Sequence, residues 1–438
     1  MRQSALYREF TTYVTLNILG SLGLSCYILA DTFFVASRLG ADGLTALNLA
    51  ISVFGLLNGL GMMLGIGGGA RYSIFQAQGM EREANRTFTI AFLTGGALGL
   101  FFALCGLFFA RPLAALLGAE GHILPMCATY LRTALSFAPF FILNQVMTAF
   151  VRNDGNPKLA MAAMLTGSLT NVVLDYVFLY PLNLGIFGAA FATGVAPVVG
   201  LALSSLHILT GRSRFRLVRE PMRPRHLVDL SALGGAAFLN ECSTSVVLVV
   251  FNLLILRLAG NLGVAAYSIV ANLAFVMLGI FNGISNGTQP LVSMACGRGD
   301  LPRQRTLYRM ALALAAAFGL GITALGLFAA PPLVALFNSA GDPALQALAE
   351  GGMHLYFLGF LFVGFNLITA SYLGATERPL PSALLSFFRG FVGIVALAIC
   401  FGLLFGLTGV WLAFPAAELL TALFGLAVQR REFLRDPN

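Results

Sequence analysis

Charge is scarce in this sequence. Only 10% of its 438 residues are Asp, Glu, Lys or Arg, against roughly 25% in an ordinary soluble domain. So few charges cannot cover the surface of a chain that is 58% hydrophobic and has a mean hydropathy of +0.85. The composition excludes a soluble enzyme, a disordered chain and a coiled coil. It predicts an integral membrane protein whose solvent is mostly lipid.

Catalytic and metal-binding motifs are also missing. The four histidines are scattered, and no HExxH, GxSxG or P-loop pattern occurs. The six cysteines lie in apolar sequence without CxxC spacing, so we interpret them as small buried hydrophobic residues. The glycine-rich run at 65–70 lacks the lysine of a nucleotide loop and favours close helix packing. We expect no enzyme activity and no cofactor, so any pumping would use an ion gradient.

Apolar runs separated by Gly, Pro and charged residues predict twelve membrane-spanning helices. A transmembrane helix needs about 20 apolar residues, and twelve of them leave no room for a soluble domain. The fold class is therefore expected to be an all-α integral membrane protein. The predicted spans are 10–37, 43–70, 87–110, 123–150, 158–180, 185–210, 228–257, 263–296, 306–330, 345–373, 380–405 and 408–429.

Lysine is nearly absent, since 25 of the 26 basic residues are Arg. With the N-terminus inside, 22 of the 26 fall on one side of the predicted spans, among them Arg389 and the six Arg of the 211–226 loop. Positive residues favour the cytoplasmic side of a membrane. We therefore predict a multi-pass protein of the plasma membrane (the bacterial inner membrane) with both termini in the cytoplasm. These cytoplasmic arginines explain the pI of 9.4, so it does not indicate a nucleic acid as a partner.

The chain repeats itself. Residues 41–121 align without a gap on residues 261–341, and Asn144 matches Asn366 at a shift of 222. Six helices separate the copies, so both have the same orientation. This predicts two six-helix lobes related by a pseudo-twofold axis along the membrane normal, an arrangement in which transporters place the substrate site between the halves. The expected monomer consists of an N-lobe at 1–210, a solvated cytoplasmic linker at 211–226 and a C-lobe at 227–438.

Four acidic residues, Asp31, Asp175, Glu241 and Glu418, lie within predicted spans. A charge at mid-bilayer costs about 2.5–3.5 kcal/mol, so such a residue usually faces a protein cavity and has a function. Asn171 and Asp175 are one helical turn apart, which places amide and carboxylate on one face. Such oxygen ligands suit a sodium ion or an exchangeable proton. The alternatives are a polar pair that packs two helices, an interfacial Asp31, a hydrogen-bonded Glu241 and a structural Glu418.

Several segments together resemble the multidrug and toxic compound extrusion (MATE) family of cation-coupled exporters. They are the loop R-N-D-G-N-P-K at 152–158, the segment N-V-V-L-D at 171–175 and the run G-I-F-G-A-A-F-A-T at 185–193. The stretches at 30–40, 289–300 and 385–389 add to the likeness, which spans nearly the whole chain.

The resemblance implies a cation site in the N-lobe that binds a proton or sodium. Its members would be the carboxylate of Asp31, the pair Asn171 and Asp175, and the hydroxyl of Thr193. If the coupling ion is sodium, the first three would ligate it. Glu241 matches the helix 7 carboxylate of the sodium-coupled branch of the family.

The sodium-coupled branch also uses an Asp on helix 10. In this chain nothing acidic lies between Glu350 and Glu377, so a complete C-lobe site is not expected. No Pro precedes Pro112, and a bend of helix 1 would have to use Gly20 and Gly23.

The resulting hypothesis is a secondary active antiporter for multidrug efflux. It would export amphipathic, cationic organic compounds in exchange for protons or sodium ions by rocking of the two lobes. The expected partners are small organic cations and the lipid bilayer. Met62, Met63, Met277 and Phe281 are candidates for the wall of the substrate cavity.

Three alternatives remain open. A flippase for lipid-linked precursors, from the wider superfamily, would need a basic cavity, whereas the predicted spans hold acids and very few Arg. A membrane-embedded enzyme would need a His/Asp or Ser/His cluster. A channel would not need buried carboxylates and lobe symmetry together.

Overall fold

The computed structural model describes residues 2–219, 224–338 and 341–435, and every regular element in these ranges is a helix. The helices of the first half are α1 (Arg2–Ala77), α2 (Glu81–Leu116), α3 (Ile123–Ser136), α4 (Ala138–Asn153), α5 (Pro157–Leu179) and α6 (Gly185–Leu209). Those of the second half are α7 (Pro224–Gly297), α8 (Leu301–Phe328), α9 (Ala330–Ala335), α10 (Pro343–Tyr356), η1 (Phe357–Gly359), α11 (Phe360–Ala375), α12 (Pro379–Phe387), η2 (Phe388–Gly393) and α13 (Ile394–Arg435).

These helices form the twelve predicted membrane spans. Nine helices in the described part of the chain are long and apolar enough to cross a membrane, and α3 and α4 form a tenth span with a 47° bend. Two of the nine, Arg225–Gly297 and Pro379–Arg431, are 73 and 53 residues long. Each of them breaks at a glycine, Gly260 or Gly406, and so crosses twice.

The backbone breaks follow the internal repeat. Gly40 and Gly260 both interrupt long helices, with φ/ψ of 66°/−156° and 62°/−157°. Gly185 and Gly406 form a second pair with φ of 60° and 61°. Residues other than glycine rarely adopt such φ values because a Cβ would clash with the backbone. Each of these two turns therefore has a glycine in both lobes, and the sequence repeat is also a repeat of the backbone structure.

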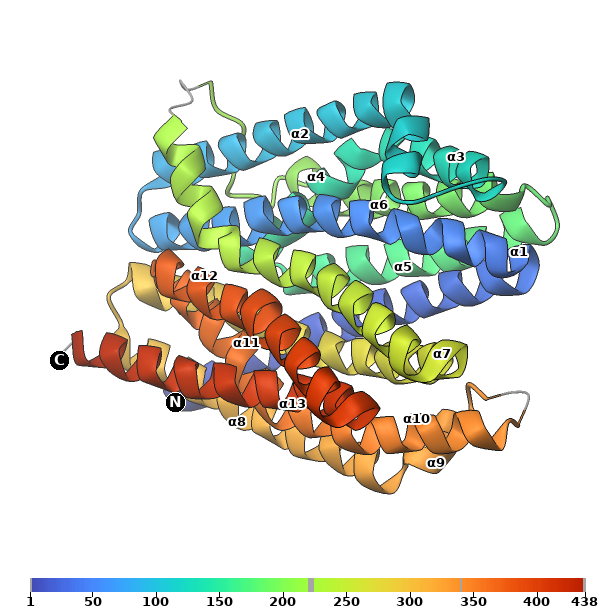
Figure 1. Cartoon of the computed structure of the whole chain (residues 1–438). Helices are drawn as coiled ribbons and strands as arrows, with labels where there is room; N and C mark the ends of the chain where they lie inside the picture. Colours follow the sequence, from blue (N-terminus) through green and yellow to red (C-terminus); the bar gives the residue numbers. More distant parts are fainter. Residues whose placement is uncertain (1, 220–223, 339–340, 436–438) are drawn as a thin grey trace.

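The two lobes lie side by side along their full length (Figure 1), with α2 to α6 in one and α8 to α13 in the other. Each has its own apolar core. The long helices α1 and α7 connect the lobes, because Phe10 and Val14 of α1 pack into the C-lobe core while Leu230 of α7 packs into the N-lobe core. We call the end of the molecule that carries residues 2–9, 154–157, 210–219 and 298–301 the basic end. It lies at the left of Figure 1.

Close backbone contacts join the lobes in the half of the molecule nearest the basic end. A Cβ built on Gly234 of α7 would stand 1.9 Å from the carbonyl oxygen of Met63, and one on Gly67 of α1 would stand 2.2 Å from that of Leu230. On the other face, Gly283 of α7 meets the backbone of Ile18 in the same way. The glycine-rich run at 65–70 therefore serves close helix packing, as predicted.

Buried polar side chains cross the interface at the same level. Asn153 of α4 accepts a hydrogen bond from Ser73 of α1 at 2.7 Å and one from Gln289 of α7 at 3.3 Å. Gln289 also donates to Ser293, the repeat partner of Ser73. At the rim, Arg71 of α1 pairs with Glu377, which precedes α12. The lobes are thus closed against each other at the basic end.

Gly234→Ala is expected to open the basic end. The added methyl group would overlap the backbone carbonyl of Met63, and a backbone atom cannot move aside as a side chain can. Spin labels at the exposed residues Met80 and Arg309, one on each lobe, should move apart relative to the unsubstituted protein.

Gly235→Ala is the matched control for this substitution. A Cβ on Gly235 meets nothing within 4 Å, so the distance between the labels should stay unchanged. Equal distances in the two variants would contradict the assignment of Gly234 to the interface.

Most of the described linker, residues 211–219, is exposed, as expected of a solvated segment, but one residue anchors it to the N-lobe. Phe215 is fully buried and packs between the rings of Tyr72, Phe88 and Phe150. The backbone N–H groups on both sides of Phe215 donate to side chains of the N-lobe, among them Asp154 at 2.9 Å. Residues 211–219 are thus bound to the N-lobe, because an aromatic residue within the basic stretch completes its core. Residues 224–226 already belong to α7, and residues 220–223 lie outside the described ranges.

Candidate functional site

Helix α5 positions the central pair of the candidate site. It begins at Pro157, whose missing N–H and fixed φ suit the first helical position, and the side chain of Asn156 caps it by accepting from the Leu159 N–H at 3.2 Å. Four turns further on, Asn171 and Asp175 lie one turn apart on the same face, and both are 0% exposed. The helix itself thus places amide and carboxylate together inside the N-lobe.

Asp31 completes a pair of carboxyl groups. It lies on α1, is 7% exposed, and its side chain faces that of Asp175. Neither Asp175 oxygen, nor Asp31 Oδ1, nor either polar atom of Asn171 has a hydrogen-bond partner among the described residues. Thr193 of α6 is also buried, and its hydroxyl donates to the carbonyl oxygen of Ala189 at 3.0 Å.

Two tyrosines belong to this site that the sequence analysis did not predict. Tyr130 of α3 lies against the hydroxyl of Thr193 and within electrostatic reach of Asp31 and Asp175. Tyr27 of α1 is in reach of the same two carboxyl groups. Its spacing of four residues from Asp31 could have indicated it, because the i, i+4 positions of a helix share a face. No local pattern points to Tyr130, which comes from a different helix.

The arrangement requires a positive charge. Two buried carboxyl groups that face each other cannot both ionise without a counter-charge, since each lacks a donor and repels the other. A shared proton or a small cation meets this need, and the carboxylate, amide and hydroxyl oxygens are ligands that a hard cation prefers. In the described ranges no three His, Cys, Asp or Glu side chains gather into a metal site. The oxygen set of the site is therefore two carboxyl groups supplemented by neutral groups.

The C-lobe contains no copy of this site. Counting along the repeat, the positions of Asn171 and Asp175 correspond to Gly393 and Leu397, and that of Thr193 corresponds to Phe414. Apolar or absent side chains thus replace all three polar ones, and Phe414 stacks on Tyr356 with ring centroids 4.1 Å apart. The two lobes thus share the backbone fold but not the polar side chains of the site.

The C-lobe has a buried ion pair instead. The Nε and Nη2 atoms of Arg389 each lie 2.8 Å from Glu418 Oε1, and Asn366 donates to Glu418 Oε2 at 2.7 Å. Arg389 also donates to Asn240 of α7 at 2.6 Å. Glu418 is 2% exposed and fully paired, so the structural interpretation holds for it.

Counting Arg389 among the residues of the cytoplasmic side was wrong. It lies in η2, inside the membrane-spanning segment Pro379–Arg431. The guanidinium lies in the lobe interior because a buried carboxylate on α13 neutralises it.

Glu241 lies between the lobes. Its Cβ would be 3.6 Å from a Cβ built on Gly59 of α1, and its carboxyl group is within electrostatic reach of Tyr27. The side chain is half-buried, unlike Asp31 and Asp175. Glu241 therefore faces the same interlobe region as Tyr27 and does not join Glu418 in a C-lobe site.

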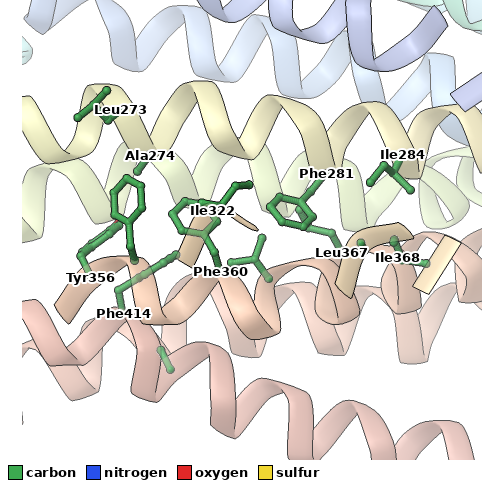
Figure 2. Close-up of a cluster of buried hydrophobic side chains, with 14 of the residues drawn as sticks. Leu273, Ala274, Phe281, Ile284, Ile322, Tyr356, Phe360, Leu367, Ile368 and Phe414 are labelled. Atoms are coloured by element: carbon green, nitrogen blue, oxygen red, sulfur yellow. The ribbon is translucent and has the colours of Figure 1, made fainter. Parts of the chain in front are cut away.

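One of the four proposed cavity residues is placed elsewhere. Phe281 is 0% exposed and stacks on Phe360 inside the C-lobe core, as Figure 2 shows. The side chain therefore points into its own lobe. The sequence could not show this, because α7 is apolar on both faces and hydrophobicity does not indicate which face meets the partner lobe. Met62, Met63 and Met277 are half-buried, and the last two pack against the edges of the two cores.

A membrane protein with two repeated six-helix lobes and a buried acidic site in one of them has the architecture of a transporter. The family model MatE matches residues 17–177 and 236–399, and the chain belongs to this family of MATE transporters.

Known proteins resemble the chain over its whole length. The multidrug export protein MepA of Staphylococcus saprophyticus is 25% identical over 430 residues, which cover 97% of this chain and 94% of that protein. MepA of Staphylococcus aureus strain MRSA252 is 26% identical over 439 residues with the same coverage.

Solved structures share the fold. A MOP superfamily transporter from Pyrococcus furiosus has a TM-score of 0.90 at 22% identity and covers 98% of this chain, which covers 96% of it. The Vibrio cholerae MATE transporter VcmN has a TM-score of 0.91 at 20% identity, with coverage of 99% and 98%.

Proposed function

We propose that this protein is a secondary active antiporter that exports amphipathic, cationic organic compounds in exchange for protons or sodium ions. The observation that carries the proposal is the buried, donor-free pair Asp31 and Asp175. Such a pair binds one positive charge and releases it when its surroundings change, which is what a coupling site must do. Relatives named multidrug export proteins support the export of drugs.

Helix α1 supplies a mechanical link from the site to the lobe interface. Its first half carries Asp31 and also packs on α7, where Gly283 meets Ile18 and Gly287 meets Val14. Binding a cation removes the repulsion between the two carboxyl groups and lets α1 approach α5. Movement of α1 then changes the contact with α7, so occupancy of the site biases the rocking of the lobes.

Glu241 supports a cationic cargo. It is a half-buried carboxylate in the interlobe region, with no Arg or Lys paired to it among the described residues. An organic cation would neutralise it, while the aromatic ring of Tyr27 and the thioether of Met62 offer adaptable apolar contacts. A flippase for anionic lipid-linked precursors would need the opposite charge at this position, so the antiporter is favoured.

The orientation follows from the charges. The basic end holds the N-terminal turns, residues 211–219 of the linker and the loop before α8, which together carry seven arginines. We place this end in the cytoplasm of a bacterial inner membrane. Since the lobes are closed there, the structure corresponds to a state in which cargo cannot reach the interlobe region from the cytoplasm.

Ethidium efflux from cells, measured as uptake into everted vesicles, tests the proposal. An imposed proton or sodium gradient should drive transport, and dissipating that gradient should stop it. Glu241→Gln should reduce ethidium transport severalfold because the cation loses its counter-charge between the lobes. The matched control is Glu120→Gln, an exposed acid at the opposite end, which should transport like the unsubstituted protein. If neither gradient drives transport of any organic cation, the proposal fails.

A further inference from the structure

A pocket opens at the basic end, away from the acidic site, where the first turns of α1 meet the N-lobe. It has a volume of about 440 Å³ and lies between the first turns of α1 and the turn that joins α4 to α5. Its walls are formed by nine residues: Ala5, Arg8, Glu9, Thr12, Tyr13, Gly155, Asn156, Pro157 and Lys158. Residues 155–158 belong to the loop that resembles the MATE family, but the transport mechanism proposed above does not use the pocket.

The walls of the pocket are basic. Arg8 and Lys158, the latter the sole lysine of the chain, are exposed and stand on opposite sides of it. The carboxylate of Glu9 is compensated by Arg303 of α8, whose Nη2 lies 2.7 Å from it. The N-terminus of α5 at Pro157 adds the positive end of a 23-residue helix dipole. The pocket therefore carries a net positive charge.

A buried cation, Arg152, lies near Tyr13 of the pocket wall. Arg152 is 4% exposed, donates to Asn17 Oδ1 at 3.0 Å, and has an Nε atom without an acceptor among the described residues. It is within electrostatic reach of Tyr13 in the pocket wall, as are the carboxylates of Glu9 and Asp154.

The corresponding region of the C-lobe carries its charges at other positions, with Arg225 and Arg378 in place of Ala5 and Asn156. Counting along the repeat, the position of Arg8 corresponds to Val228 and that of Lys158 corresponds to Leu380. The helices are the same in both lobes, so helix packing does not require basic residues at these positions. The placement of Arg8 and Lys158 on opposite sides of the pocket is therefore not a consequence of the shared helix packing.

We propose that this pocket binds a phosphate group, and that in the membrane its source is the head group of an anionic phospholipid. Phosphate oxygens accept hydrogen bonds from Arg, Lys and the N-terminus of a helix. The pocket lies at the basic end, which we place at the cytoplasmic face, and we expect the head groups of that leaflet at this level. A bound lipid would hold α1 against the turn between α4 and α5. The inference needs only this pocket at a membrane surface and is independent of transport activity.

Native mass spectrometry of the delipidated full-length protein tests the proposal, with phosphatidylglycerol and phosphatidylcholine as probes. The unsubstituted protein should prefer phosphatidylglycerol. Each basic residue near an anionic surface contributes about 1 kcal/mol, so Arg8→Gln combined with Lys158→Gln should weaken phosphatidylglycerol binding by roughly 30-fold. Glu9→Gln, which removes the carboxylate from the pocket wall, should strengthen it.

The control is Arg298→Gln combined with Arg309→Gln, two exposed arginines at the same end of the C-lobe. It removes the same charge but leaves the pocket intact, so binding should weaken by less than about threefold. An equal loss in both double variants, or equal binding of the two lipids, would overturn the proposal.

Added inorganic phosphate separates the two sources of the phosphate group. Persistence of phosphatidylglycerol binding in excess phosphate supports the lipid head group. Displacement by phosphate, lost in the Arg8/Lys158 variant, supports the same site with a soluble phosphate as its ligand.

Discussion

Asp175→Asn is expected to abolish gradient-driven efflux. The neutral amide keeps the size of the side chain and its burial but leaves Asp31 as the only acidic group of the site. A buried charge of this kind is worth about 3 kcal/mol, which corresponds to roughly a hundredfold in cation affinity. Transport in everted vesicles should fall to the background, while equilibrium binding of ethidium to the purified protein should persist.

Asp31→Asn should have the same effect, because the two carboxyl groups act as one site. Asp42→Asn is the matched control: it lies on the same helix, is exposed, and pairs only with His122 at the opposite end. Loss of ethidium binding together with transport would indicate a folding defect. Full gradient-driven transport by Asp175→Asn would refute the coupling assignment.

Arg389→Met is expected to be the most destabilising of the substitutions discussed here. It leaves the carboxylate of Glu418, 2% exposed, with only the amide of Asn366 as a partner. Removing one member of a buried ion pair costs about 3–5 kcal/mol, because the other charge stays in a medium of low dielectric constant. Thermal unfolding can be followed by the fluorescence of Trp411, which is the sole tryptophan and is buried in the same lobe.

Arg389→Met combined with Glu418→Met should be more stable than either single variant. Replacing both charges by apolar side chains removes the desolvation penalty together with the attraction. The control is Arg303→Gln, which breaks the partly exposed pair with Glu9 and should cost about 1 kcal/mol or less. If Arg389→Met costs no more than this control, the ion pair does not stabilise the lobe.

The fold was largely predictable because its determinants are local. An apolar run of sufficient length forms a helix in lipid whatever lies elsewhere in the chain, so all twelve spans were located. The repeat added the lobe symmetry, and Gly40 and Gly260 take the same backbone conformation at equivalent positions. The placement of Arg389 in a loop was wrong, since charge counting treats every arginine as belonging to a loop.

The candidate site was only partly predictable. Asn171 and Asp175 share one helix, so the helical period alone places them together. The position of Asp31 opposite Asp175 was anticipated from the family resemblance, and the structure brings the two carboxyl groups together. Tyr130 and the burial of Phe281 could not be deduced in the same way. The reason is that a helix in lipid is apolar whether its face meets a lobe core, the partner lobe or the bilayer, so hydrophobicity does not distinguish these surroundings.

The sequence by itself determined the helices, their number, the twofold repeat and the scarcity of buried charge that makes each acid informative. These properties depend on neighbours within one or two helical turns. Only the tertiary structure decided which charges are neutralised and which are not. It paired Glu418 with Arg389 and left Asp31 facing Asp175 without a donor, because such pairings join residues 29 and 144 positions apart and depend on how separate helices pack.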